Sequence, residues 1–160
     1  MTTIAPDRLN AWQDYVDALD SLDEEMRFEF IVDLGKQVAD GGFPEAARTP
    51  DNEMYGCMSK VWILHDVETG PDGARHRFQG DSDAIIVKGL VTMMTRSFSG
   101  LSGEELSALT LDHVRRLNLG ALTTQRQVGM MAMLKHMQKL SRQWQVAEAG
   151  AIGAERSEAG

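Results

Sequence analysis

The sequence predicts a single α+β domain, in which helices pack against a small antiparallel sheet of two or three strands. The chain has 160 residues, of which 42% are apolar, and this is enough for one hydrophobic core. Apolar residues recur at helical spacing towards both ends of the chain, whereas the middle alternates as a strand does. Because the sequence shows no internal repeat, we expect one domain over residues 1–147 and a flexible tail over residues 148–160.

Two helices are predicted in the first third of the chain. The first follows Pro6 and carries apolar residues three or four positions apart, namely Leu9, Trp12, Val16 and Leu19. The second opens at Ser21–Glu24, where a serine followed three residues later by a glutamate has the pattern of a capping box. Its expected apolar face consists of Phe28, Ile31, Val32 and Leu34.

A β-hairpin is predicted in the middle of the chain. The glycines and proline of Asp40–Pro44 end the second helix, and a long polar loop follows over residues 45–53. Residues 60–67 have the alternating pattern of a strand. The turn-forming residues 68–73 separate this strand from a second one over residues 75–80, so the two strands should pair.

Three further helices are predicted in the second half of the chain. Asp81–Asp83 precedes an apolar stretch and should cap a helix over residues 84–97. Ser102–Glu105 opens a short helix, and Thr124 begins a long last helix that should end near Ala147. Six methionines on these helices are expected to fill the core rather than to form a docking face: Met93, Met94, Met130, Met131, Met133 and Met137.

The composition excludes several classes of function. A formal net charge of −8 argues against a nucleic acid partner, because binding to a phosphate backbone requires a basic surface. The N-terminus lacks the apolar run of a signal peptide, and the most apolar stretch, Ala84–Met94, is too short to span a membrane. We therefore expect a cytoplasmic protein without a membrane partner. The four histidines lack the spacing of a metal motif, so no metal site is expected.

Cys57 is the only cysteine of the chain, so an intramolecular disulfide and a cysteine-rich metal cluster are both impossible. A lone cysteine is most often a small buried apolar residue. Cys57, however, follows Gly56 at the end of the long polar loop, where a thiol could reach a partner protein. With no second cysteine and no adjacent histidine, the sequence favours a thiol that accepts a group and later gives it up.

The segment Asn52–Trp62 resembles the cysteine loop of the SufE/CsdE family, which are sulfur acceptors for cysteine desulfurases. The matching positions of that loop are Asn52, Gly56, Cys57, Ser59, Val61 and Trp62. A second block, Phe78–Leu90, resembles the family's Gly-Asp-Ser-Asp-Ala segment and the helix after it. Weaker similarity is found at Arg27–Gly35 and Thr124–Gly129, so the resemblance extends over roughly residues 7 to 145.

This resemblance implies a fold similar to SufE and IscU, and a function in iron–sulfur cluster metabolism. Cys57 would take sulfur from the persulfide of a cysteine desulfurase, stimulate that enzyme, and pass the sulfur to an iron–sulfur scaffold or another acceptor. Pyridoxal phosphate belongs to the desulfurase, so this chain needs no cofactor. The residues expected to shape or support the loop are Asn52, Gly56, Ser59, Trp62, Asp81, Ser82, Asp83 and Arg126.

Several of these assignments have alternatives. Trp62 could cover the cysteine loop or belong to the core, and Arg126 could pair with Asp81 and Asp83 or face the partner. The chain as a whole could instead be a non-covalent adaptor of a desulfurase, in which case Cys57 is incidental. An iron–sulfur scaffold and a one-cysteine peroxidase are weaker alternatives, since scaffolds hold their clusters with several cysteines.

Overall fold

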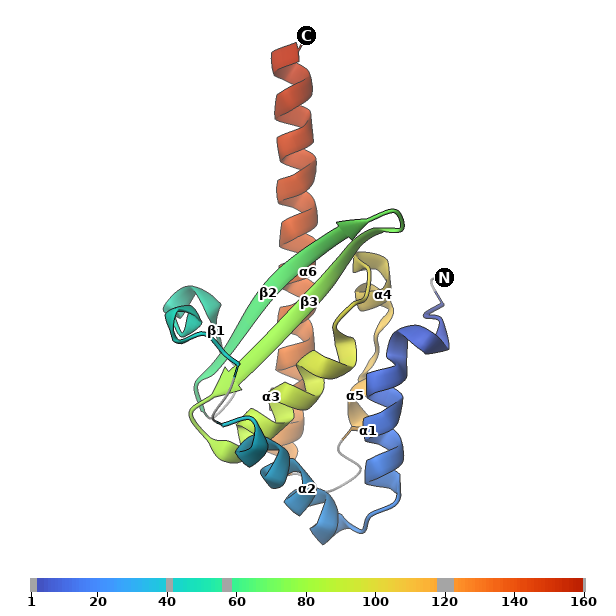
Figure 1. Cartoon of the computed structure of the whole chain (residues 1–160), viewed down its shortest axis with the longest axis vertical. Coiled ribbons are helices and arrows are strands. Elements are labelled where there is room, and N and C mark those ends of the chain that lie inside the picture. The colour runs from blue at the N-terminus through green and yellow to red at the C-terminus, as the bar shows by residue number, and fades with distance from the viewer. Residues whose placement is uncertain (1–2, 40–41, 56–58, 118–122, 160) are drawn as a thin grey trace.

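The fold is organised around a three-stranded antiparallel sheet with strand order β1-β2-β3, as the computed structural model shows (Figure 1). The structure describes residues 3–39, 42–55, 59–117 and 123–159. β1 (Glu53–Met54) pairs with the start of β2 (Val61–Gly70), and β2 pairs along its whole length with β3 (Gly73–Ser82). Helices pack against this sheet, so the predicted single-domain α+β fold is confirmed.

The N-terminal region contains the short 3-10 helix η1 (Pro6–Leu9), α1 (Asn10–Asp20) and α2 (Glu24–Gln37). The four apolar residues that predicted the first helix are all buried. The capping box predicted at Ser21 is wrong. Asp23 caps α2 instead, accepting a hydrogen bond of 2.9 Å from the backbone N–H of Met26, whereas Ser21 ends α1. Phe28, expected on the buried face of α2, is 38% exposed.

The hairpin of β2 and β3 is longer than the sequence predicted. Its turn consists of Pro71 and Asp72 alone, because Gly70 pairs directly with Gly73. The polar residues before the turn therefore continue β2 instead of forming a loop, and this end of the hairpin is exposed to solvent. The long loop before the sheet contains two short 3-10 helices, η2 (Glu45–Ala47) and η3 (Pro50–Asn52).

The second half of the chain contains α3 (Ile85–Phe98), α4 (Gly103–Ala108), α5 (Leu111–Arg115) and α6 (Thr124–Ala159). The capping box predicted at Ser102 is confirmed, since Ser102 and Glu105 exchange hydrogen bonds of 2.9 and 3.1 Å. The sequence did not predict α5, which has too few residues to show helical periodicity. α6 continues to Ala159, beyond its predicted end near Ala147. Flexibility of residues 148–160 stays a prediction.

α2 and α3 cross at very short distance because each has a glycine at the contact. A Cβ atom added to Gly35 would collide with the carbonyl oxygen of Ile85, and one added to Gly89 with that of Ile31. Both obstacles are backbone atoms, which cannot rotate away as a side chain could. The two glycines therefore fix how closely α2 approaches α3, the helix that packs on β3.

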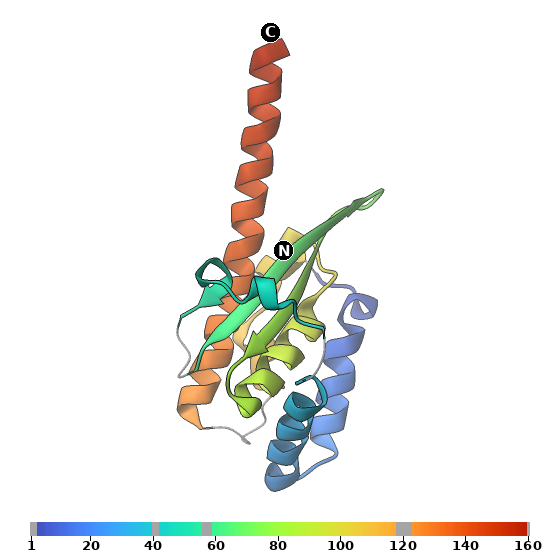
Figure 2. The same ribbon diagram turned by 60° about the vertical axis from the view of Figure 1, so that its left-hand side comes forward.

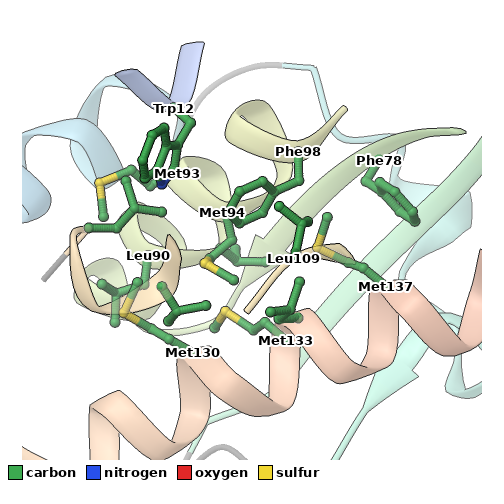
Figure 3. Close-up of a cluster of buried hydrophobic side chains, with 14 of the residues drawn as sticks. Trp12, Phe78, Leu90, Met93, Met94, Phe98, Leu109, Met130, Met133 and Met137 are labelled. Carbon is green, nitrogen blue, oxygen red and sulfur yellow. The ribbon is translucent and has the colours of Figure 1, made fainter. Parts of the chain in front are cut away.

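Methionines fill much of the core between α3 and α6. Figure 3 shows Met130, Met133 and Met137 of α6 directed towards α3, where Met93 and Met94 lie. All five are almost completely buried, which confirms the core role predicted for them. Met131 differs, because it is only half-buried at the edge of the core.

The last turns of α6 extend away from the rest of the molecule (Figures 1 and 2). Residues 145–151 are all exposed, and Val146 is 73% exposed. At the start of this stretch the side chain of Gln145 still lies against Gly103 of α4, so the helix leaves the rest of the molecule from about Val146 onwards. Across the residues that the structure describes, no helix is both long enough and apolar enough to cross a membrane.

Two histidines link the hairpin to α6. His65 Nε2 of β2 lies 2.8 Å from His76 Nδ1 of β3, and the two rings are stacked. On its other side, His76 Nε2 lies 3.3 Å from the hydroxyl of Ser141, and its ring meets the edge of Trp144. Burial lowers the pKa of both histidines, and that of His65 falls to about 4 because the neighbouring His76 also opposes its charge.

The free energy of unfolding should therefore decrease as the pH falls from 6.5 towards 4. In this interval His65 is protonated in the unfolded chain but largely neutral in the folded protein, so protonation favours unfolding. We expect His65 to contribute about 1–2 kcal/mol, which discounts the full pKa shift for its partial exposure. Urea titrations across this pH range test the prediction. His65→Phe keeps a ring on Phe78 and should show a shallower pH dependence, so equal slopes would contradict the prediction.

Candidate functional site

The segment that joins β1 to β2 carries the only cysteine of the chain. Met54 pairs with Val61 and Glu53 pairs with Trp62, so residues 55–60 connect two hydrogen-bonded strands. Cys57 and Gly56, both predicted to belong to the site, lie outside the described residues. Before them, Tyr55 is 80% exposed, which places the start of this connection at the surface.

The far end of the connection is clamped to the end of β3. The hydroxyl of Ser82 donates a hydrogen bond of 2.7 Å to the carbonyl oxygen of Lys60. The backbone N–H of Lys60 donates to Asp83 Oδ1 at 3.1 Å, and the N–H of Asp83 returns a bond of 3.3 Å to the same carbonyl. Ser82 and Asp83 thus hold the residue that leads from the cysteine segment into β2.

These contacts correct the prediction that Asp81–Asp83 caps a helix. The N-cap of α3 is Ala84, and no side chain caps it. The hydroxyl of Ser82 does accept a bond of 3.3 Å from the N–H of Ala84, but this lies before the first turn of the helix. The side chains of Ser82 and Asp83 are hydrogen-bonded to the backbone of Lys60, so they point towards the connection rather than towards the helix.

Asp81 is the buried centre of an ion cluster. Its carboxylate is bonded by Arg48 Nε at 2.7 Å and by Lys88 Nζ at 3.1 Å. Burial alone would raise the pKa of Asp81, but hydrogen bonds from Arg48, Lys88 and the Ser82 backbone outweigh burial and lower it. Arg48, whose guanidinium also lies over the ring of Phe43, ties the loop before β1 to β3 and α3.

The sequence did not single out Arg48 or Lys88. Arg48 lies 33 positions before Asp81, and neither cation belongs to a local pattern that marks an ion pair. Asn52 has a local role, since its side-chain amide donates a bond of 2.9 Å to the carbonyl of Ala47. Trp62 is half-buried, on the face of β2 opposite to the buried Val61 and Ile63.

Ser59 and Arg126 line the same cavity, which we call the Ser59 cavity. Its volume is about 390 Å³, and it lies between the start of α3 and the start of α6. Most of its wall is apolar, formed by Ala84, Ile86, Val87, Leu90 and Met133. Arg126 is the only charged side chain among the described residues of its wall. Asp81 pairs with Arg48 and Lys88, not with Arg126 as one interpretation of the sequence expected.

The described residues provide no evident metal site. Among them, no group of three or more His, Cys, Asp or Glu side chains could hold a metal ion. The described ends of the connection are an exposed Tyr55 on one side and, on the other, Ser59 beside a mainly apolar cavity and Lys60 held by Ser82 and Asp83.

A protein family described as SufE, an Fe-S metabolism associated domain, matches residues 13–141. The chain belongs to the SufE family. An uncharacterised SufE-like protein of Rhizobium etli is 34% identical over 119 residues, which cover 73% of this chain and 79% of that protein. A second SufE-like protein, from Rhizobium meliloti, is 33% identical over 125 residues, which cover 76% and 88%.

A solved structure has a similar fold. The solution structure of a hypothetical protein from Thermus thermophilus superposes with a TM-score of 0.62 and 21% sequence identity. The match covers 83% of this chain and 94% of that one, so it includes most of both folds. Membership of the SufE family associates the chain with iron–sulfur metabolism.

Proposed function

We propose that this protein accepts sulfur from a cysteine desulfurase on Cys57, stimulates that enzyme, and delivers the sulfur for iron–sulfur cluster assembly. Membership of a family associated with iron–sulfur metabolism supports the general assignment. The observation that carries the specific role is the construction around the cysteine segment. It joins two paired strands, is clamped through Lys60, and includes Ser59, which lines a cavity where Arg126 is the one charged side chain among the described wall residues.

Arg126 gives the Ser59 cavity the electrostatic character that a sulfur anion needs. A free cysteine with an ordinary pKa near 8.5 is mostly protonated at neutral pH, and its thiolate is the reactive form. A guanidinium in an apolar wall, with no carboxylate among the described wall residues, favours an anion nearby. The same charge would favour a terminal persulfide anion after sulfur has been accepted.

The transfer step requires only thiol exchange. The Cys57 thiolate attacks the outer sulfur of the donor's cysteine persulfide, and a new S–S bond forms at Cys57. The S–S bond of the donor breaks, and its cysteine leaves as a thiolate, which takes up a proton. Total oxidation state is unchanged, so the step needs no separate oxidant and no cofactor on this chain.

Trapping the sulfur tests this proposal directly. The protein is incubated with a pyridoxal phosphate-dependent cysteine desulfurase and free cysteine, alkylated, digested, and analysed by mass spectrometry. We expect the Cys57 peptide to gain the mass of one sulfur atom, and a reductant to remove it. The proposal is wrong if the desulfurase carries a persulfide under these conditions and Cys57 acquires none.

A non-covalent adaptor is the second candidate. The exposed Tyr55 next to the cysteine segment could contact a desulfurase without any transfer of sulfur. An adaptor would change the affinity or conformation of the enzyme and would not need a thiol, so the two functions predict opposite results when Cys57 is replaced.

A further inference from the structure

A second surface cavity, which we call the α5–α6 groove, lies between α5 and the first turns of α6. Its volume is about 390 Å³. Val114 is buried at its base, and Met131 and Ala132 are half-buried along it. Leu111 and Val128 lie on opposite sides and are 41% and 59% exposed. Such exposed apolar side chains around a hollow are typical of a surface that a protein partner covers.

The charges of the α5–α6 groove are all positive among the described residues that line it. These charges are Arg115 of α5 and Lys135 of α6. The nearest carboxylate partner of Arg115 is Asp112, at 3.8 Å and with both side chains well exposed, which is a weak ion pair. A partner that enters this groove therefore meets two cations with little local compensation.

The basic character of this region contrasts with the rest of the chain. Residues 111–147 contain six lysines and arginines and one carboxylate, although the whole chain has a net charge of −8. The opposite holds at the N-terminal helices, where residues 7–33 contain nine carboxylates and two arginines. The electrostatic field near the α5–α6 groove thus attracts an acidic surface, whereas α1 and α2 repel one.

The α5–α6 groove adjoins the Ser59 cavity, because the same turns of α6 line both. Arg126, Gly129 and Met133 face the cavity, whereas Val128 and Lys135 face the groove. Residues one or two positions apart on a helix point to different sides. A partner bound in the groove would therefore lie beside the Ser59 cavity.

We propose that the α5–α6 groove binds an acidic surface segment of the partner protein, which places apolar side chains between Leu111 and Val128 and carboxylates near Arg115 and Lys135. The inference rests on the proposed function, in which this partner is the cysteine desulfurase.

A second copy of the chain fits the groove less well than a partner does. Its acidic α2 has exposed Met26 and Phe28, which could enter the groove of a neighbour. That contact joins two different surfaces, so a single contact leaves one groove and one α2 free, and it closes only where two copies exchange it reciprocally or a ring forms. A desulfurase needs no such closure, which favours a different protein as the occupant.

Paired charge reversals test the inference. Arg115→Glu with Lys135→Glu alters the groove, and Lys139→Glu with Arg142→Glu makes the same change of net charge at exposed positions of α6 outside it. Both pairs are made in a Cys57→Ser background, and binding to the desulfurase is measured by calorimetry at low and high salt. We expect the groove pair to weaken binding about tenfold or more, and the control pair about twofold or less.

Salt and an apolar substitution give further readouts. Added salt should weaken binding of the parent protein more than that of the groove pair, because screening acts on charges that the pair has lost. Val128→Asp, at an exposed position, should also weaken binding, since it places a carboxylate opposite the acidic partner. Circular dichroism checks that each variant is folded.

Several outcomes would overturn the inference. Equal affinities of the groove pair and the control pair exclude the groove as the docking site, and absence of any binding by the parent excludes the partner. Self-association in sedimentation that only the groove pair abolishes would identify a second copy as the occupant. Since a Cys57→Ser protein cannot accept sulfur, these affinities are independent of the sulfur-trapping result, and either proposal can fail alone.

Discussion

Replacing Cys57 with serine is expected to abolish sulfur acceptance and the stimulation of the desulfurase that depends on it. A serine hydroxyl is un-ionised at neutral pH and forms no stable bond to sulfane sulfur, so it cannot replace the thiolate in exchange. We expect the rate of sulfur acceptance to fall by more than about a hundredfold. The measurement is the sulfide released from cysteine by the desulfurase, with and without the variant, together with the mass of its loop peptide.

The single cysteine provides a matched control for this variant. Alkylation of the wild-type protein modifies Cys57 alone and should reproduce the loss, whereas the same treatment of Cys57→Ser should change nothing. If Cys57→Ser stimulates the desulfurase as well as the wild type does, the covalent relay is excluded and the adaptor is favoured. Unchanged thermal unfolding of the variant excludes a loss caused by misfolding.

Elements with a strong local signal were predicted well from the sequence. The capping box of Ser102 and Glu105 is confirmed because both partners lie within one turn. The capping box predicted from the similar pattern at Ser21 was wrong, since Asp23, two residues later, is the N-cap of α2. The sequence predicted a sheet of two or three strands but did not locate β1, because a strand of two residues has no alternating pattern.

The candidate site was predictable where one short segment contains it and not where distant segments meet. Ser82 and Asp83 were identified by their motif, but their bonds to Lys60 follow from the hairpin register that brings β3 beside the cysteine segment. The shared cavity of Ser59 and Arg126 depends on how α6 packs against α3. These partners lie far apart in the sequence, so no local sequence pattern predicts their contacts.

Asp81→Asn is expected to destabilise the protein by about 3 kcal/mol, because a buried ion pair that loses one partner leaves the other charge uncompensated. The side chains of Asp81 and Lys88 are only 6% and 13% exposed, so water cannot replace the missing carboxylate. Asparagine preserves the shape of the side chain and isolates the effect of its charge. Urea unfolding at neutral pH gives the change in free energy.

Glu68→Gln provides the control, since its carboxylate also bonds an arginine, Arg77, at 2.8 Å, but with a side chain 59% exposed. We expect that variant to change stability by less than about 0.5 kcal/mol. An equal cost for both variants would show that burial of Asp81 is not what matters.

Acid provides a second test of the same charge. Hydrogen bonds hold the pKa of Asp81 below 3.8 in the folded protein, so its contribution is present above this pH and is lost as the pH falls through the folded value. Asp81→Asn removes that contribution at every pH, and its stability should approach that of the wild type in strong acid. Because Arg48 reaches Asp81 from the loop before β1, the same variant should also loosen the approach to the cysteine segment. Slower sulfur acceptance by Asp81→Asn at a temperature where it remains folded would therefore connect this buried ion cluster to the function of the loop.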